Sequence, residues 1–289
     1  MLLQLVVSGI ALGALYALVA LSMTVVYRAT TVLNFGHGDL VMAGAFAVYV
    51  LVLLVGMPYG LAVPLALVIL FGFGVGIQRG LIRPMAHGPH IALVMMTIAI
   101  GYVIRGVARL VWGRDVMPMR KVLDIEPIFI GDVVVTGDDL LILGVVVLLT
   151  AVFFYVLYKT LAGKRIQALY QTERGAGLVG INVSKFQGTI WGVGAAMGAI
   201  GGALIAPITL LYPDMGANLL IKGFAAMALG GFGSLWGAVI GGILLGVIEH
   251  TAGAYISTAL IDISAYLIII GVLIIRPTGI LGYEATVRV

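Results

Sequence analysis

Cysteine and charge are what this sequence lacks most clearly, and each absence excludes a class of protein. There is no cysteine, so disulfide bonds and cysteine-based metal sites are excluded. Charged residues make up 10% of the 289 residues, whereas an ordinary soluble domain has about 25%. A soluble fold of this length needs a charged surface. Most of this protein's surface must therefore face lipid or other apolar helices.

Motifs for energy conversion and for nucleic-acid binding are also missing. No Gly-xxxx-Gly-Lys-Ser/Thr phosphate loop occurs, so ATP must be hydrolysed elsewhere if it is used. The net charge of +4 does not come from a basic stripe with interleaved aromatic residues, and we expect no nucleic-acid partner. His87 and His90 lie beside Arg83 in a basic loop, which favours a solvated loop over a metal site. A membrane-embedded enzyme is therefore disfavoured, and no metal or catalytic residue is predicted.

Long apolar runs dominate what is present. Hydrophobic residues make up 62% of the chain, and the mean hydropathy is +1.19. A helix needs about 20 apolar residues to cross a hydrocarbon core of about 30 Å. We therefore predict an all-α, polytopic transmembrane helix bundle of about eight to nine spans. The predicted spans are residues 2–27, 35–55, 61–82, 91–112, 140–158, 186–210, 224–231, 235–248 and 261–275, and the sequence leaves open whether segments 35–55 and 221–235 cross fully.

Glycine is abundant, at 41 residues, and much of it recurs at every fourth position. Small residues at this spacing let helix backbones approach closely in lipid. We expect these glycines to mediate helix packing. The runs are Gly9/Gly13, Gly72/Gly76/Gly80, Gly194/Gly198/Gly202 and Gly233/Gly237/Gly241.

The distribution of charge predicts the topology. No charged residue precedes Arg28, which fits an uncleaved first span with the N-terminus outside. Segment 113–139 mixes acids with bases and is expected to be a periplasmic loop. Within it, the alternation from Ile128 to Val135 and a turn at Thr136-Gly137-Asp138 predict a small hairpin. Segment 159–186 has a positive excess and is expected to be cytoplasmic, as is the C-terminus after Arg276.

Two glycine-interrupted segments are candidates for the translocation path. Both read Gly-x-Gly-polar-Leu, and they occur at comparable places in the two halves of the chain, which suggests an internal repeat. Unwound backbone at membrane depth is tolerated only where it is buried or lines a cavity. Chance is the alternative, because glycine is so common here. The candidate path residues are Asn34, Gly36, His37, Gly38, Asp39, Gly231, Gly233 and Ser234.

The few charges near the spans have ordinary interpretations. An acid inside a span is usually functional, but Asp39 also fits the membrane-surface start of a helix, and we favour that interpretation. Glu249-His250 could line the path, yet the outer end of a helix is favoured. Arg105 and Arg109 lie one turn apart, and snorkelling to the interface explains them.

The cytoplasmic segment contains the strongest functional signal, between Tyr170 and Asn182. Thr172 is a plausible N-cap, Glu173 suits the first turn, and Gly180 can end the helix in a left-handed conformation. That leaves about two turns, or about 10 Å. Gly175, Ala176 and Gly177 would leave a flat face, and Leu178 and Ile181 would offer apolar anchors. The pattern favours a short helix that docks into another protein's groove over an ordinary linker.

The stretch from Arg165 to Asn182 resembles the coupling-loop motif of the LivH-type permeases of branched-chain amino acid ABC importers. Segments 11–18 (ALGALYAL), 33–39 (LNFGHGD), 230–238 (GGFGSLWGA) and 276–282 (RPTGILG) are also similar to that family. The resemblance therefore extends over nearly the whole chain. Gly175 and Gly177 depart from it, because alanine is more common there, and this puts the stiffness of the coupling helix in doubt.

The resemblance implies one permease domain over residues 1–289, with a type II ABC importer-like fold, in the bacterial cytoplasmic (inner) membrane. It implies a transport subunit that is no ATPase and binds no cofactor itself, because partner ATPases bind ATP and Mg. The implied partners are a LivM-like second permease, two LivG/LivF-like ATPases and a periplasmic solute-binding protein. The implied ATPase-coupling residues are Thr172, Glu173, Arg174, Gly175, Ala176, Gly177, Leu178, Gly180, Ile181 and Asn182, and we expect Glu173, Arg174 and Ala176 in the interface.

The implied substrates are branched-chain amino acids or similar small polar solutes. Related permeases handle urea, short amides and aromatic or aliphatic carboxylates, so these stay as alternatives. A secondary transporter driven by ions is a further alternative. It would need intramembrane acids as ion ligands, and the apolar runs contain few of them.

Overall fold

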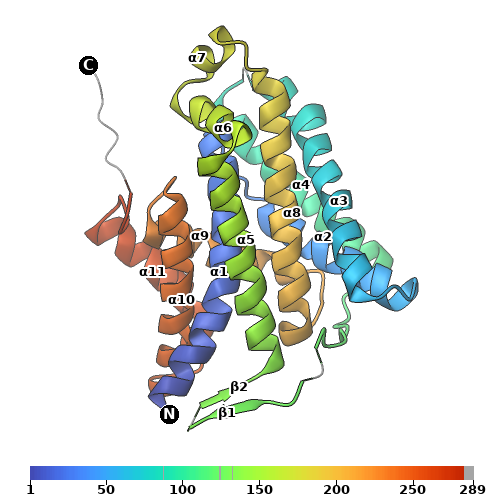
Figure 1. Cartoon of the computed structure of the whole chain (residues 1–289), viewed down its shortest axis with the longest axis vertical. Helices are drawn as coiled ribbons and strands as arrows, with labels where there is room; N and C mark the ends of the chain where they lie inside the picture. The colour runs from blue at the N-terminus through green and yellow to red at the C-terminus, as the bar shows by residue number, and fades with distance from the viewer. Residues whose placement is uncertain (87, 124, 132, 283–289) are drawn as a thin grey trace. The chain divides into compact units, whose positions relative to one another are not determined.

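The structure is a computed structural model that describes residues 1–86, 88–123, 125–131 and 133–282. Nearly all of its secondary structure is helical (Figure 1). The helices are α1 (Leu2–Thr30), α2 (His37–Tyr49), η1 (Val50–Leu54), α3 (Tyr59–Ile77), η2 (Gln78–Ile82), η3 (Arg83–Met85), α4 (His90–Trp112), α5 (Gly137–Lys159), α6 (Leu161–Gln171), α7 (Glu173–Leu178), α8 (Val183–Thr209), α9 (Met215–Gly230), α10 (Leu235–Tyr255) and α11 (Leu260–Ile275).

In the described part of the chain, seven helical segments are long and apolar enough to cross a membrane. Two shorter apolar helices, α9 and α11, have 16 residues each. The prediction of a polytopic helical bundle is therefore confirmed. The doubtful segment 35–55 contains an 18-residue helical stretch, His37–Leu54. The doubtful segment 221–235 covers the end of α9, a break, and the start of α10.

The chain forms two compact units. Unit 1 comprises Met1–Thr24, Lys121–Gly144 and Asn218 onward, and unit 2 comprises Val25–Arg120 and Val145–Ala217. Three of the four boundaries fall inside α1, α5 and α9, so these three helices contribute residues to both units, and the fourth lies between Arg120 and Lys121 in the segment after α4.

Unit 2 is organised around α2, which packs against α3, α4 and α8, while α3 also packs against α8. Small residues allow these contacts. A β-carbon on Gly44 would meet Ala199 of α8, and one on Gly202 would meet the carbonyl oxygen of Val41. The predicted close approach along Gly194/Gly198/Gly202 is confirmed for Gly198 and Gly202, which both lie against α2.

The run Gly72/Gly76/Gly80 in unit 2 was expected to mediate packing, and this is wrong. A β-carbon at each of these positions would meet no described atom within 4 Å. Gly74 makes the contact instead, against Trp191 of α8. The spacing was recognised, but which face of α3 is buried depends on α8, which the local sequence does not show.

Unit 1 pairs the first part of α1 with α10. Gly9 and Gly13 lie against Gly246 and Gly242, where a β-carbon would collide with backbone. Gly241 similarly lies against Ala226 of α9. These glycines therefore set the distance between helices, as the sequence predicted. Helix α11 packs against α10.

The predicted hairpin in segment 113–139 is present in unit 1. Strands β1 (Ile128–Ile130) and β2 (Val133–Val135) are antiparallel, with Ile128 opposite Val135. The turn contains Gly131, which has a φ of +62°. The expected turn at Thr136-Gly137-Asp138 is wrong: Thr136 instead caps α5, since its hydroxyl accepts from the backbone N–H of Asp139 and donates to the Asp139 carboxylate. Asp124 and Asp132 lie outside the described residues.

Candidate functional site

The short helix α7 has the two ends that the sequence predicted. Thr172 Oγ1 accepts a hydrogen bond from the Gly175 N–H at 3.4 Å, so Thr172 is its N-cap. Gly180 follows with a φ of +82°, and the Ile181 N–H donates to the Ala176 carbonyl at 3.0 Å. Asn182 caps the next helix, α8, by accepting from the Lys185 N–H at 3.0 Å. It therefore starts α8 and is not part of the short helix.

Helix α7 packs against its neighbours α6 and α8 (Figure 1). Some of its residues are exposed and others are buried. Glu173 and Arg174 are exposed, and Leu178 is 89% exposed. Ala176 is only 2% exposed, so the expectation that it lies on a docking face is wrong. Ile181 is half-buried, and Val179 is the second exposed apolar side chain. The exposed face of this segment therefore runs from Glu173 to Val179 without Ala176.

Helix α6, which was not predicted from the sequence, connects α5 to α7. Thr160 caps it by accepting from the Gly163 N–H at 3.2 Å. Near its end, the Arg28 guanidinium lies 4.6 Å from the ring centroid of Tyr170. Burial raises the pKa of the Tyr170 hydroxyl, and Arg28 opposes this rise, so the hydroxyl stays protonated at neutral pH. The segment between α5 and α7 is thus an ordered, capped helix and not an irregular linker. A polar capping residue after Lys159 was the available signal for it.

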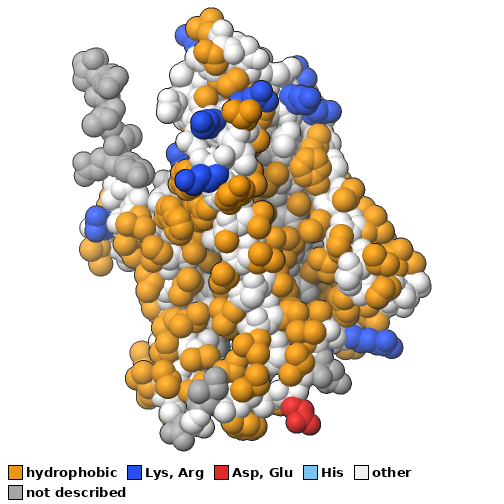
Figure 2. Space-filling view, viewed as in Figure 1, with side chains coloured by type: hydrophobic (Ala, Val, Ile, Leu, Met, Phe, Trp, Pro, Cys, Tyr) orange, Lys and Arg blue, Asp and Glu red, His pale blue; other side chains and the backbone are white. Residues whose placement is uncertain are grey.

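Basic side chains gather around α6 and α7 (Figure 2). Glu173 is the acid in this region, and its carboxylate accepts from the Gln187 side chain of α8 at 2.7 Å. The positive excess found in the sequence therefore lies at one end of unit 2. The exposed basic residues at this end are Arg28, Arg79, Arg83, Lys159, Lys164, Arg165, Arg174 and Lys185, while His87 lies outside the described residues.

The first glycine-interrupted segment starts α2 inside unit 2. Asn34 Oδ1 accepts from the Gly36 N–H at 3.0 Å, and the Phe35 N–H donates to Thr97 Oγ1 at 3.1 Å. Thr97 is seven residues into α4, which is about 10 Å along that helix. Gly36 also lies against the backbone of Gly101 in α4. The helix start that the favoured interpretation expected is present, with Asp39 in the first turn of α2, and its position at the membrane surface stays a prediction.

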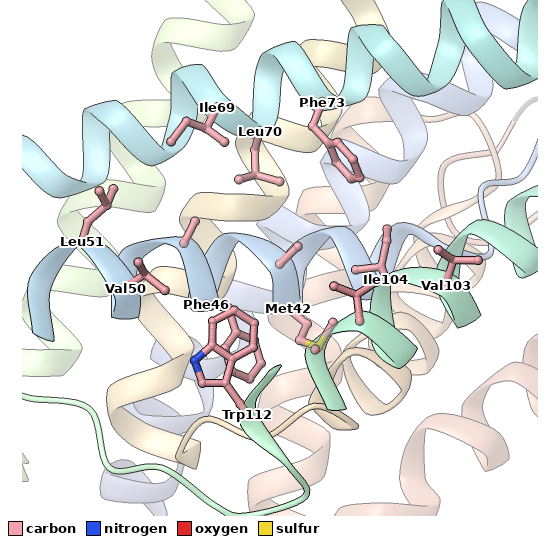
Figure 3. A pocket seen from close by; sticks show the side chains of 14 residues that line it. Met42, Phe46, Val50, Leu51, Ile69, Leu70, Phe73, Val103, Ile104 and Trp112 are labelled. Carbon is pink, nitrogen blue, oxygen red and sulfur yellow. The ribbon is translucent and has the colours of Figure 1, made fainter. Parts of the chain in front are cut away.

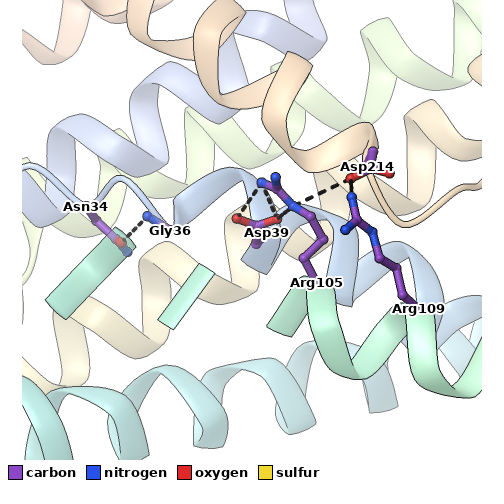
Figure 4. A network of polar contacts seen from close by, with 6 residues as sticks. All are labelled: Asn34, Gly36, Asp39, Arg105, Arg109 and Asp214. Carbon is purple, nitrogen blue, oxygen red and sulfur yellow. Dashed lines mark hydrogen bonds and ion pairs between the residues drawn. The ribbon is translucent and has the colours of Figure 1, made fainter. Parts of the chain in front are cut away.

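Asp39, in the first turn of α2, belongs to a charged network (Figure 4). Its carboxylate accepts from Arg105 Nε at 3.0 Å and from Nη2 at 3.1 Å. The Asp39 side chain is only 3% exposed. Asp214, from the loop before α9, continues the network: it lies 3.9 Å from Arg105 Nε and pairs with Arg109. Arg105, whose side chain is 17% exposed, is thus the ion-pair partner of Asp39, and snorkelling alone does not explain its position.

The neighbours of Asp39 are packed rather than exposed. His37 is fully buried, and a β-carbon on Gly198 of α8 would lie 3.3 Å from its Nε2. Gly38 lies against Gly216, where a β-carbon would lie 2.7 Å from the Gly38 carbonyl oxygen. The residues from Asn34 to Asp39 are therefore brought together at one buried point. Their role in a path stays a prediction.

The second glycine-interrupted segment is a tight turn between α9 and α10 in unit 1. Gly231 and Gly233 have φ values of +108° and +79°, and Ser234 Oγ accepts from the Gly237 N–H at 3.0 Å. The C-terminal segment packs onto this turn, and the Leu281 N–H donates to the Gly230 carbonyl at 2.9 Å. The segment therefore breaks the helix as predicted, and its role in a path stays a prediction.

Unit 1 contains a second ion pair between helices, which was not predicted from the sequence. Lys222 Nζ of α9 donates to Glu249 Oε1 of α10 at 2.6 Å and to the Tyr16 hydroxyl at 2.9 Å. The Tyr16 hydroxyl donates to Glu249 Oε1 at 3.2 Å. Glu249 is 1% exposed and six residues before the end of α10, so its placement at the helix end is wrong. A lone lysine in an apolar stretch was the available signal.

Unit 2 also has an apolar cavity of about 540 Å³ between α2, α3 and α4 (Figure 3). Its walls include Met42, Phe73 and Val103, and the rings of Phe46 and Trp112 lie side by side with centroids 4.5 Å apart. Every lining side chain is apolar. A charged or polar solute would lose its hydration there without gaining partners. This cavity is therefore no candidate for a polar substrate site.

The long apolar helices and the ion pairs held between them define a class: a polytopic helical membrane protein. The chain belongs to the family described as branched-chain amino acid transport system, permease component, which matches residues 5–276.

Several relatives match over nearly the full length. The Escherichia coli K12 high-affinity branched-chain amino acid transport system permease protein LivH is 29% identical, covering 97% of this chain and 95% of that protein. BraD, the corresponding permease protein of Pseudomonas aeruginosa, is also 29% identical with the same coverage. A probable LivH permease of Methanocaldococcus jannaschii is 28% identical and covers 93% of this chain and 89% of that protein.

One solved structure is similar in fold. PsaBC from Streptococcus pneumoniae, in complex with Fab, aligns with a TM-score of 0.51 over 94% of this chain and 91% of that chain. The sequences are 14% identical, so the match shows the fold alone.

Proposed function

We propose that this chain is a transmembrane subunit of an ATP-binding-cassette importer for branched-chain amino acids, driven by separate ATPases that dock on α7. The observation that carries the proposal is the geometry of α7. It is a six-residue helix, capped at Thr172 and stopped at Gly180, with Leu178 almost fully exposed. An apolar side chain held outward on a short, fixed helix suits a groove in a protein partner. Family membership supports the substrate class.

Direct contacts link α7 to other helices of unit 2. Its first residue, Glu173, is hydrogen-bonded to Gln187 of α8, and α7 packs against both α6 and α8. Helix α8 packs in turn against α2 and α3. A movement imposed on α7 would therefore reach the helix that carries Asp39. Alternating access needs such a link, because nucleotide and solute can act only through different affinities for two states.

The proposed assembly has five parts. Two permeases, this chain and a LivM-like partner, form the path, two LivG/LivF-like ATPases bind ATP and Mg, and a periplasmic protein delivers solute. The proposed membrane is the bacterial cytoplasmic membrane. The basic end around α6 and α7 faces the cytoplasm in this proposal, and segment 113–139 faces the periplasm, because loops rich in Lys and Arg stay inside.

The structure sharpens the alternative of an ion-coupled carrier. Such a carrier needs acids inside its spans, and the structure does show two, Asp39 and Glu249. Each is paired with a basic side chain, Arg105 or Lys222, and so is not a free ion ligand. Proteoliposomes containing this chain without ATPases should therefore not take up L-leucine along a proton or sodium gradient. Uptake under those conditions would favour the carrier.

The test of the docking face is Leu178→Asp in the whole importer, reconstituted with its binding protein. A charge on the exposed face should abolish L-leucine-stimulated ATP hydrolysis while the permease still inserts and assembles with its partner permease. Val116→Asp is the matched control, because Val116 is exposed in the loop after α4 and should leave coupling unchanged. Normal coupling in Leu178→Asp would rule out α7 as the ATPase contact.

A further inference from the structure

Unit 1 contains a polar pocket beside the Lys222–Glu249 pair. Its volume is about 340 Å³, within the range of about 300–1,000 Å³ that is usual for small-molecule sites. The pocket lies between α9 and α11, and it differs from the cavity of unit 2 because charged groups line it. The lining residues are Asn218, Ile221, Lys222, Asp262, Ala265 and Tyr266.

Lys222 supplies a fixed positive charge to this pocket. Its ammonium group has three N–H donors, and two are used by Tyr16 and Glu249. Within the part of the chain that the structure describes, the third donor has no partner. An ammonium group held in place by two hydrogen bonds, with one donor to spare at a pocket wall, is suited to bind a carboxylate.

Asp262 supplies the opposite charge. It lies in the first turn of α11 and is exposed, and no basic side chain pairs with it among the described residues. The remaining walls are partly apolar, with Ile221 and Ala265 between the charged residues. One pocket thus combines a cation, an anion and an apolar surface.

We propose that this pocket binds a zwitterionic amino acid, with its carboxylate at Lys222, its ammonium at Asp262, and its side chain against Ile221 and Ala265. The inference rests on the proposed function and adds the site and the reason for the substrate class. Urea and short amides carry no charge, so they offer no ionic partner to the spare N–H donor of Lys222 or to Asp262, and a simple carboxylate offers none to Asp262. An amino acid satisfies both groups, so the pocket selects among these solute classes.

Tyr16 and Glu249 act in this proposal as positioning residues. Both are buried, and both accept a hydrogen bond from the Lys222 ammonium group. Glu249 Oε2 has no hydrogen-bond partner among the described residues, so the carboxylate is anchored through Oε1 alone.

The test is direct binding of radiolabelled L-leucine to the purified importer without its binding protein. Competitors are unlabelled L-leucine, 4-methyl-2-oxopentanoate, which lacks the ammonium, and 3-methylbutylamine, which lacks the carboxylate. L-leucine should compete best. Asp262→Asn should lower the affinity for L-leucine by about tenfold, the usual effect of losing one charged hydrogen bond. The affinity for the oxo acid should stay within about twofold of the wild-type value. Glu126→Gln, an exposed acid of unit 1 outside the pocket, is the control.

Lys222→Gln should lower the affinity for L-leucine and for the oxo acid, which both carry the carboxylate, and leave the affinity for the amine unchanged. Equal competition by all three compounds in the wild-type importer, or an Asp262→Asn variant that binds like wild type, would overturn the inference. L-leucine uptake by the complete importer with its binding protein is measured in parallel. If uptake persists but the expected binding pattern is absent, the pocket is excluded as the amino-acid site, while the proposed function of the chain is still supported.

Discussion

The two units each bury an acid–base pair between helices, but the pairs differ in geometry. In unit 2, the Arg105 guanidinium engages both oxygens of Asp39. In unit 1, the Lys222 ammonium engages only Oε1 of Glu249, and Oε2 is left without a partner among the described residues. A guanidinium matches a carboxylate with two parallel hydrogen bonds, whereas an ammonium acts as a point charge.

The surroundings follow the same contrast. Asp39 lies against Gly101, where a β-carbon would collide with its carboxylate, so the carboxylate is tightly packed on that side. Lys222 faces a polar pocket of about 340 Å³. A satisfied and tightly packed pair fixes helices, whereas a pair with a spare donor beside a cavity can bind something else. We therefore interpret Asp39–Arg105 as a structural ion pair that holds α2 against α4, and we call it the strut. Lys222–Glu249 is interpreted as part of a binding site.

Asp39→Ala should have the largest effect on stability. It leaves the partly buried Arg105 charge with only the more distant Asp214. Breaking a buried pair costs about 3–5 kcal/mol of unfolding free energy, and we expect a loss at the lower end of that range because Arg105 is partly exposed. Unfolding of the purified chain in detergent measures the loss. The double variant Asp39→Ala/Arg105→Leu should recover part of it. A single variant as stable as wild type, or a double variant no better than the single, would contradict the role of a strut.

Gly101→Ala tests the packing under that strut. The added methyl group would displace the Asp39 carboxylate and press on Gly36, and overpacking of this kind costs about 1–3 kcal/mol. Gly106→Ala is the matched control in the same helix, because a β-carbon there meets no described atom within 4 Å. Thermal unfolding of both variants decides the point. Equal melting temperatures would show that the contact at Gly101 relaxes freely.

Tyr16→Phe should have the smallest effect. It removes one hydrogen bond to Lys222 and one to Glu249 but keeps the ion pair, so we expect a loss of about 1 kcal/mol. Chemical unfolding in detergent measures it. A loss as large as that of Asp39→Ala would mean that the pair in unit 1 is also a strut, and the comparison would fail.

Much of the fold follows from local pattern. Apolar runs of sufficient length locate the long helices, and capping and stop residues locate α7, because these signals act over a few residues. The hairpin from Ile128 to Val135 was also predicted, although its turn lies at Gly131. Glycine spacing indicated close helix packing but not which face of α3 is buried, since that depends on Trp191 of α8.

The candidate sites were harder to predict because their partners are distant in sequence. Asp39 and Arg105 are 66 residues apart, and Lys222 and Glu249 are 27 apart on different helices. Taken alone, each charge looks like a helix end or a snorkelling residue. Ala176 was misjudged for the same reason: a small residue on a short helix suggests a flat exposed face, and only the packing of α6 and α8 against α7 shows that it is buried.

The most direct test of the account is whether an ATPase touches α7. A photoreactive benzoylphenylalanine placed at Leu178 should crosslink to an ATPase subunit in the assembled importer, while the same residue at Val116 should not. We predict a crosslinked product of this chain and one ATPase, whose yield changes between the nucleotide-free and ATP-bound states. The absence of an ATPase crosslink at Leu178, in an importer that still transports L-leucine, would contradict the account.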